Sequence, residues 1–206
     1  MTKIIFLLKA LMRILATVCN LFLHKEIGYL VFLLKREFIT QLHKGEFHSF
    51  GKDSLLGLDS LILKPKYISI GMNTTFGNRM TLTCYDHSQN GSQLEYHTPS
   101  ITIGNGVSIG EDAHITCINK IVIGNNVLMG KKILITDNAH GSSDRSMRDV
   151  APIKRPLHSK GAVVIEDNVW IGEKASIMPG VHIGRSAIIG TNAVVTKNVP
   201  AYSVVV

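Results

Sequence analysis

Hydrophobic residues recur at every sixth position in the C-terminal half of the chain. The aliphatic positions are Ile165, Ile171, Ile177, Ile183, Ile189 and Val195. A helix would repeat its apolar face at intervals of three and four residues, and a half-buried strand would alternate at every second residue. Because neither period fits, the pattern predicts a stack of short identical units, each of which buries its apolar side against its neighbours.

A second position in each unit is also restricted. Four residues after each aliphatic residue the side chain is small or apolar, as in Val169, Ala175, Val181, Ala187, Ala193 and Val199. We interpret each unit as a short strand and a tight turn, with the aliphatic side chain inside and three units closing one triangular coil. Glycine follows the aliphatic residue at Gly172, Gly184 and Gly190, where we expect it to permit backbone angles that side chains resist.

The same two-position pattern continues upstream. Residues 103–120 and 123–140 each predict about one coil, with Ala139 in the last small position, and residues 165–200 predict two more. A weaker coil is expected within 61–82. The sequence therefore predicts an all-β core of about five coils, in which successive coils pair like parallel strands about 4.8 Å apart.

The N-terminal region has a different pattern and predicts helices. Two apolar runs, 4–23 and 29–34, lie on either side of Gly28. Lys9 and Arg13 interrupt the first run four residues apart, so they share one face of a helix and leave a broad apolar surface opposite. We expect two helices separated near Gly28.

The charge of this region leaves two interpretations of it open. Residues 1–44 contain seven Lys and Arg and two Glu, and so carry +5 of the chain's net charge of +7. Such helices can lie in the surface of an anionic membrane, or can be buried against the core or a partner subunit. We expect 1–48 to form an apolar, basic helical appendage and 49–206 to form the repeat domain, with loops at about 84–98 and 141–161.

Several classes of protein are disfavoured. The charges within the apolar run argue against a membrane-spanning helix. A signal peptide is disfavoured because no small-residue cleavage site follows the run. Nucleic acid is not an expected partner, because no nucleic-acid-binding module accompanies the positive charge. Cys19, Cys84 and Cys117 form no paired motif, which favours a reducing compartment. We expect a cytoplasmic protein, peripheral on the inner face of the cytoplasmic membrane if the helices bind lipid.

A polar stretch at 137–160 interrupts the repeat and contains the strongest candidate for chemistry. Insertions in stacked folds project from the core and build sites on its flank. His140 lies where the repeat ends and the insertion begins, and a histidine can act as a general base near neutral pH. His114 is a weaker candidate among the nine histidines. Asp137 can orient the loop or His140, or can simply form a turn.

Motifs around this interruption resemble those of the hexapeptide-repeat acyltransferases. Residues 127–130 run on to His140, and 165–172, 179–181 and 194–200 follow in the same order and spacing. The resemblance covers about 100–206 and is greatest to galactoside and maltose O-acetyltransferases and to the O-acetyltransferases of bacterial polysaccharide biosynthesis. It implies a left-handed parallel β-helix, usually a homotrimer with sites between subunits, which moves an acetyl group from acetyl-CoA to a hydroxyl.

The resemblance also implies roles for single residues. His140 aligns with the catalytic histidine, which removes the proton from the acceptor hydroxyl as that hydroxyl attacks the thioester directly. Trp170, Thr191, Thr196 and Lys197 match positions along the CoA site, where the lysine approaches the phosphates. No metal ion is expected.

The acceptor is expected to be a saccharide of a bacterial surface glycan or its lipid-linked precursor. Asp137, Asp86 and Arg148 are candidate contacts with it. The sugar acetyltransferases have an asparagine near the acceptor where this sequence has Gly110, so the acceptor itself stays open.

Three other functions are kept as alternatives. The acceptor can be a small free molecule, such as serine, an amino-sugar or a drug, or the protein can be a non-catalytic scaffold on a membrane. A zinc carbonic anhydrase of the same fold is disfavoured, because the closely spaced histidine pair of that enzyme is absent after His114.

Overall fold

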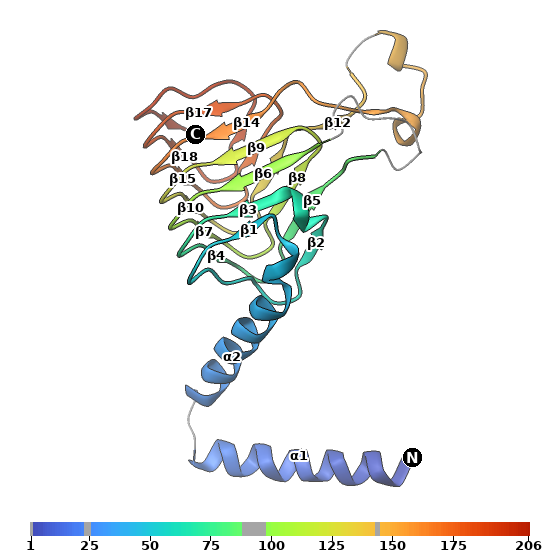
Figure 1. Cartoon of the computed structure of the whole chain (residues 1–206), viewed down its shortest axis with the longest axis vertical. Coiled ribbons are helices and arrows are strands. Elements are labelled where there is room, and N and C mark those ends of the chain that lie inside the picture. Colours follow the sequence, from blue (N-terminus) through green and yellow to red (C-terminus); the bar gives the residue numbers. More distant parts are fainter. Residues whose placement is uncertain (1, 23–25, 88–97, 143–144) are drawn as a thin grey trace.

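The computed structural model describes residues 2–22, 26–87, 98–142 and 145–206. Its main body is a triangular prism with three faces, each a parallel sheet of six strands (Figure 1). The chain passes through faces A, B and C in turn, and each coil from β3 to β19 gives one strand to each face. The prism confirms the fold that the six-residue period predicts.

The strands follow one another along each face from the N-terminal to the C-terminal end of the prism. Face A contains β1 (Ser49–Phe50), β3 (Ile68–Ile70), β6 (Ser100–Ile103), β9 (Lys120–Ile123), β14 (Val163–Ile165) and β17 (His182–Ile183). Face B contains β4 (Thr75–Phe76), β7 (Ser108–Ile109), β10 (Leu128–Met129), β15 (Trp170–Ile171), β18 (Ile188–Ile189) and β20 (Val204–Val205). Face C contains β2 (Leu61–Leu63), β5 (Thr81–Cys84), β8 (His114–Cys117), β11 (Leu134–Thr136), β16 (Ser176–Ile177) and β19 (Val194–Val195).

The other elements lie outside these faces. They are helices α1 (Thr2–Phe22) and α2 (Glu26–His43), the antiparallel pair β12 (Ala139–His140) and β13 (Leu157–His158), and the short 3-10 helices η1 (Lys44–Glu46), η2 (Pro65–Tyr67), η3 (Arg145–Met147) and η4 (Pro152–Lys154).

The repeated aliphatic residues fill the prism. Ile165, Ile171 and Ile177 are completely buried, as the pattern predicts. The weaker coil expected within 61–82 is present in β3, β4 and β5. A further coil precedes it, formed by β1, Leu55 and β2. Its apolar pattern is the least regular, which is why the sequence indicates about five coils where each face has six strands.

The glycines that follow the aliphatic residues serve a different purpose from the one we expected. Gly172, Gly184 and Gly190 do not have positive φ angles. A Cβ atom on Gly172 would instead lie 2.6 Å from the backbone nitrogen of Thr191 in the next coil. Close approach of successive coils therefore requires these glycines. The left-handed backbone angle falls two residues later in the turn, for example at Lys174 with φ of 59°.

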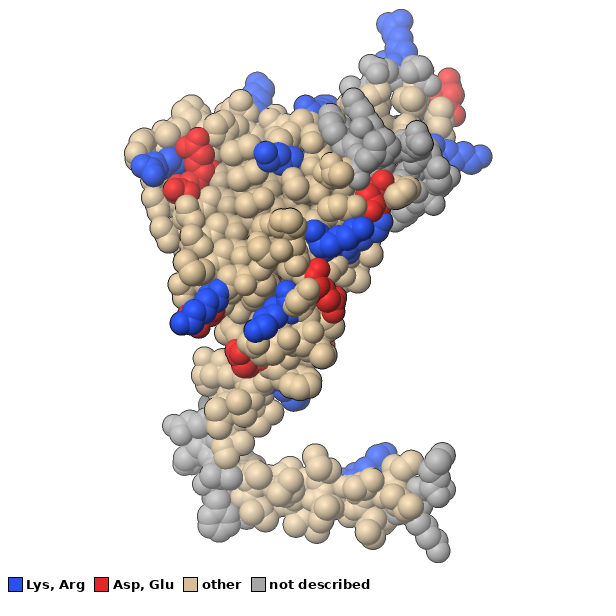
Figure 2. Space-filling view, in the orientation of Figure 1, with Lys and Arg blue, Asp and Glu red and all other residues tan. Residues whose placement is uncertain are grey.

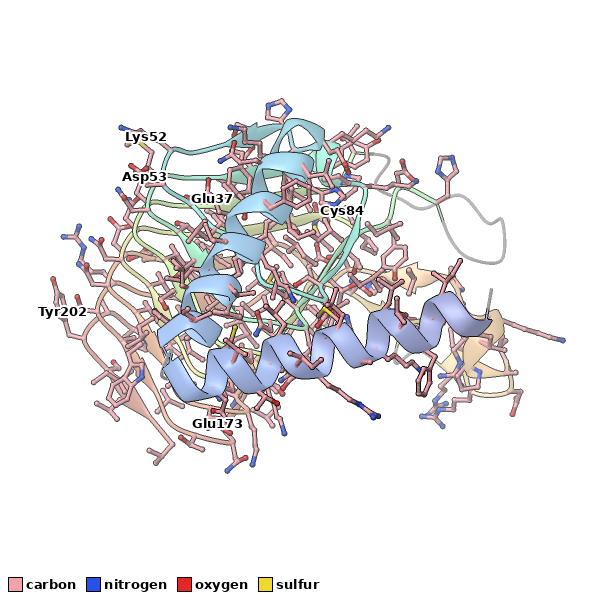
Figure 3. All side chains as sticks on the ribbon, turned by 90° about the horizontal axis from the view of Figure 1, so that it is seen from below. Glu37, Lys52, Asp53, Cys84, Glu173 and Tyr202 are labelled. Carbon is pink, nitrogen blue, oxygen red and sulfur yellow. The ribbon has the colours of Figure 1, made fainter. Side chains whose placement is uncertain are left out.

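The three corners of the prism differ in length. Figure 3 looks along the prism, where Lys52, Asp53 and Tyr202 mark the corner between faces A and B, Glu173 marks the corner between B and C, and Cys84 lies at the end of face C. Additional residues collect at the third corner, between faces C and A, which we call the C–A corner. Among the described residues, the segments that lie between a strand of face C and the next strand of face A are 64–67, 85–87, 98–99, 118–119, 137–142 and 145–162. Both expected loops therefore leave the prism from the same corner.

Ala139 departs from the expected repeat. The pattern assigns it to a buried small position, but it is exposed in β12. The chain has already left the coil at this point, because β11 ends at Thr136 and β12 pairs with β13 in the insertion.

Helix α2 closes the N-terminal end of the prism. The Arg36 guanidinium donates hydrogen bonds to the carbonyls of Leu56 at 3.1 Å and Phe76 at 2.9 Å, and Thr40 Oγ1 accepts one from the Leu56 amide at 2.9 Å. Burial lowers the pKa of Arg36. Arg36 and Thr40 are four residues apart and so share the face that meets the coil. Gly28, expected to separate the helices, lies inside α2, where open space surrounds it.

Helix α1 lies away from the prism, on the far side of α2 (Figure 1). Most of its large apolar side chains are exposed, among them Phe6 and Leu7, each at 74%. Its surface is correspondingly poor in charge in Figure 2. None of the helices in the described residues is long and apolar enough to cross a membrane. The division at residue 48 stays a prediction.

Candidate functional site

The Asp137 side chain fixes the backbone where the chain leaves the fourth coil. Its side chain is completely buried and accepts hydrogen bonds from the backbone amides of Ile118 at 2.9 Å and Asn119 at 2.8 Å, both in the coil below. The Cys117 thiol donates to it at 3.1 Å, and the Asn138 side-chain amide donates at 3.1 Å. The carboxylate is thus used to fix the corner, and both of its oxygens are occupied within the fold.

His140 lies just beyond this anchored corner. It pairs with Leu157 in the β12–β13 ribbon, and the next amide, of Gly141, donates to the Pro156 carbonyl at 2.8 Å. The residue is exposed, and within the described residues its imidazole has no hydrogen bond to Asp137. The ribbon therefore holds the backbone of His140 and leaves its ring open to a ligand.

The neighbouring thiol is unsuited to nucleophilic chemistry. Cys117 is buried and lies beside Cys84, its partner in the adjacent strand. The hydrogen bond to Cys84, burial and the nearby Asp137 carboxylate all raise the pKa of Cys117 far above its ordinary range. The thiol stays protonated, whereas the thiolate is the nucleophilic form.

The four residues matched to a CoA site occupy two different edges of the prism. Thr196 and Lys197 follow β19 at the C–A corner, on the same edge as His140, and both are exposed. Trp170 lies on face B and is 51% exposed, and Thr191 lies at the corner between faces B and C. Face C separates the two pairs, so a single subunit does not bring all of them to one place.

The insertion that follows His140 is internally braced. Arg155 donates from Nε to the Val150 carbonyl at 2.8 Å and from a terminal nitrogen to the Arg148 carbonyl at 3.4 Å. A Cβ atom on Gly141 would lie 2.8 Å from Cδ of Arg155. The guanidinium of Arg155 is thus used within the loop, while Arg148 is exposed and remains a candidate acceptor contact.

Sequence reasoning named Asp86 but missed the polar cluster that Lys64 and Tyr67 form with it at the C–A corner. This carboxylate is only 8% exposed and accepts hydrogen bonds from Lys64 Nζ, from Tyr67 at 3.1 Å and from His87 Nδ1 at 2.9 Å. Lys64 lies 22 residues before Asp86, close to the length of one coil. That spacing is the signal by which the pair could have been found. Residues 88–97 of the same loop lie outside the described residues.

Two other sequence expectations concern the prism itself. His114 is exposed on face C, away from the corner. A Cβ atom at Gly110 would lie 2.4 Å from the Gly130 carbonyl oxygen, so this position cannot supply the acceptor contact that the sugar acetyltransferases have there. In the part of the chain that the structure describes, no three His, Cys, Asp or Glu residues are grouped to hold a metal ion.

The chain is similar in sequence to a family model and to known acetyltransferases. A family model described as bacterial transferase hexapeptide (six repeats) matches residues 162–197. The chain is 33% identical over 150 residues to WbbJ of Escherichia coli (strain K12), which is described as an O-acetyl transferase of lipopolysaccharide biosynthesis. That alignment covers 70% of this chain and 73% of WbbJ. A galactoside O-acetyltransferase of Lactococcus lactis subsp. lactis (strain IL1403) is 29% identical over 106 residues, which is 49% of this chain and 46% of that enzyme.

A solved structure gives the same fold. AntD, an N-acyltransferase from Bacillus cereus in complex with dTDP and 3-hydroxybutyryl-CoA, superimposes with a TM-score of 0.63 over 80% of this chain and 80% of its own, at 19% identity. This likeness concerns the fold alone, which is the left-handed parallel β-helix. Since a third of the residues are identical to WbbJ over most of both chains, the protein belongs to the hexapeptide-repeat family of bacterial acyltransferases.

Proposed function

We propose that this protein moves an acetyl group from acetyl-CoA to a sugar hydroxyl of a bacterial surface polysaccharide or of its lipid-linked precursor. Membership of the family supports acyl transfer, and the description of WbbJ supports this class of acceptor. The observation that carries the proposal is the exposed imidazole of His140. His140 lies on the β12–β13 ribbon, and the buried Asp137 fixes the chain just before this ribbon begins.

His140 acts as the general base. An alcohol is a weak nucleophile at neutral pH, and a positioned base accelerates its attack by about 10²- to 10⁴-fold. The imidazole takes the hydroxyl proton as the oxygen bonds to the thioester carbonyl carbon. The tetrahedral intermediate then expels the CoA thiolate, which takes the proton back from the imidazolium. Direct transfer agrees with the protonated, buried state of Cys117.

CoA lies between subunits of a homotrimer. Lys197 and Thr196 share an edge with His140, whereas Trp170 and Thr191 lie across face C. Both pairs of residues line one groove when the C–A corner of one subunit packs against face B of the next subunit. Lys197 meets the CoA phosphates as a point charge, and Trp170 offers a half-exposed ring to the pantetheine arm.

The helices hold the enzyme at the cytoplasmic face of a membrane. Exposed apolar side chains on α1, such as Leu7 and Leu11, lie opposite Lys9 and Arg13, which is the arrangement of a helix that lies in an anionic membrane surface. The apolar surface of α2 continues into a pocket of about 800 Å³ between this helix and the first coil. A lipid-linked acceptor would then be close to the surface on which the enzyme rests.

Release of CoA from acetyl-CoA tests the proposal, with fragments of surface polysaccharide and simple galactosides as acceptors. We expect His140→Ala to lower kcat about 10²- to 10⁴-fold, and His182→Ala, in β17 of face A and outside the insertion, to leave it unchanged. Equal turnover in wild type and His140→Ala would exclude His140 as the base. Faster transfer to serine or an amino-sugar than to any glycan would favour a small free acceptor.

A further inference from the structure

The His87 imidazole is bonded to Asp86 on one side and exposed to solvent on the other. The buried Asp86 carboxylate accepts from His87 Nδ1 at 2.9 Å, while the His87 side chain is 80% exposed. A neutral imidazole that donates from Nδ1 carries its free lone pair on Nε2. The hydrogen bond to Asp86 therefore fixes the tautomer and leaves Nε2 as an outward-facing acceptor.

The rest of the cluster keeps Asp86 in place and balances its charge. Lys64 donates to the carboxylate oxygen that His87 uses, and Tyr67 donates to the other oxygen at 3.1 Å. Lys64 has a left-handed backbone angle, and Pro65 then begins η2, which places Lys64 and Tyr67 beneath Asp86. One ammonium offsets one carboxylate, and the exposed group of the cluster is the His87 imidazole. With Nε2 as its acceptor, the ring matches a hydroxyl group, which has a proton to donate.

The cluster lies on the same edge of the prism as His140. Asp86 follows β5 in the second coil and His140 follows β11 in the fourth, and both segments leave from the C–A corner. β5, β8 and β11 are consecutive neighbours on face C. Two strand spacings separate the corners by about 10 Å along the prism axis. This distance exceeds a single sugar ring.

We propose that His87 Nε2 accepts a hydrogen bond from a hydroxyl on the second ring of the saccharide acceptor, while the first ring lies at His140. This inference rests on the proposed function and makes the acceptor at least a disaccharide. Asp86 is a positioning residue, which acts through the His87 ring. The oxygens of Asp86 accept hydrogen bonds from Lys64, Tyr67 and His87, so we assign it this indirect role, while a direct contact of Asp86 with the acceptor stays a prediction.

The test compares kinetics of the full-length protein with one-ring and two-ring acceptors. The panel consists of neutral disaccharides and the methyl glycosides of their single rings, with lactose and methyl β-galactoside as one pair. We expect His87→Ala to raise KM for the disaccharide about 3- to 10-fold, the value of one neutral hydrogen bond. KM for the methyl glycoside, KM for acetyl-CoA and kcat should stay within about twofold. His87→Gln, which retains an acceptor oxygen, should recover part of the loss.

A matched control separates a specific contact from a general effect of losing a surface histidine. His182 is 50% exposed and its Nε2 is 2.8 Å from Glu166 Oε1, but it lies on β17 of face A. His182→Ala should change none of these constants. The long-range ¹H–¹⁵N spectrum should show His87 as the Nδ1–H tautomer in wild type, and Asp86→Asn should remove that preference.

Each result supports or overturns the inference. Unchanged KM in His87→Ala with active wild type overturns the second-ring site and leaves the proposed function intact. An equal rise in KM for one-ring and two-ring acceptors also overturns it. A loss of kcat like that of His140→Ala would make His87 part of the proton transfer instead. Wild-type protein that acetylates no saccharide would overturn the proposed function itself.

Discussion

Asp137 Oδ2 in the fourth coil accepts a hydrogen bond from the backbone amide of Asn119 in the third at 2.8 Å. The same carboxylate accepts from Ile118 at 2.9 Å, so one buried side chain joins two coils where the segment carrying His140 begins. Asp137→Asn replaces an oxygen acceptor by an NH₂ group that faces an N–H donor. We expect a loss of about 1–3 kcal/mol in the free energy of unfolding.

Activity should fall in the same variant, because His140 then leaves the corner in a different direction. A displacement of about 1 Å can cost about 10²-fold in rate, so we expect kcat to fall about 10- to 100-fold, with KM for acetyl-CoA little changed. Asp149→Asn, at an exposed position in the insertion, is the matched control for loss of a carboxylate. If both variants retain wild-type kcat, the corner does not position the base.

Thr40 and Leu56 provide a test of how α2 is attached. Thr40 is 1% exposed and accepts from the Leu56 amide at 2.9 Å. Thr40→Val keeps the shape but leaves a buried amide without a partner, which costs about 1–3 kcal/mol. Thr17→Val removes an exposed bond to the Arg13 carbonyl and should change stability by less than about 0.5 kcal/mol. Urea unfolding measures both, and equal midpoints would show that α2 does not contribute to the folded core.

The period of six predicts most of the prism because it depends on one local rule. Every sixth side chain must point inward, and residues such as Ile165 and Ile171 obey this rule without reference to the rest of the chain. The rule fails where the chain leaves the coil. Ala139 continues the pattern by coincidence, and Gly28 does not break its helix, because one glycine costs a helix only about 1 kcal/mol.

The site is less predictable because its contacts join different coils. His140 is visible in the sequence as the residue at the interruption. The bond from Asp137 to Asn119 spans 18 positions, and that from Lys64 to Asp86 spans 22. Finding these contacts requires knowing which residues of successive coils lie side by side. The sequence does not give this register, because the number of residues at the C–A corner differs from coil to coil. Lys197 and Trp170 lie on different edges of the prism, so a site that uses both would depend on assembly as well.

The cysteines test direct transfer against an acyl-enzyme. Cys84 and Cys117 are buried, while Cys19 in α1 is partly exposed. A raised pKa keeps Cys117 in the unreactive thiol form at pH 8. Iodoacetamide should therefore label Cys19 in the folded protein and all three cysteines after unfolding, as read by mass spectrometry. Acyl transfer should survive labelling of the folded form, and a loss of activity that follows Cys117 labelling would contradict direct transfer.

Single charge changes on opposite sides of α1 test the membrane proposal. Leu11 belongs to the exposed apolar side of the helix, whereas Thr17 lies with Lys9 and Arg13 on the other. Leu11→Glu and Thr17→Glu change the net charge equally, but only the first puts a carboxylate where acyl chains would lie. Binding of full-length protein to phosphatidylglycerol vesicles should fall about 10-fold or more for Leu11→Glu, since a buried leucine contributes about 1.5–3 kcal/mol.

Salt separates the two effects on membrane binding. Thr17→Glu should weaken vesicle binding only about fivefold, from about 1 kcal/mol per charge near an anionic surface. That difference should disappear in 1 M salt, where the Debye length is about 3 Å. The loss from Leu11→Glu should remain, because it comes from apolar contact. Equal, salt-sensitive losses in both variants would mean that α1 meets lipid only through its charges. If the wild-type protein does not sediment with vesicles, the membrane proposal fails, and a protein partner is the expected contact of the apolar side of α1.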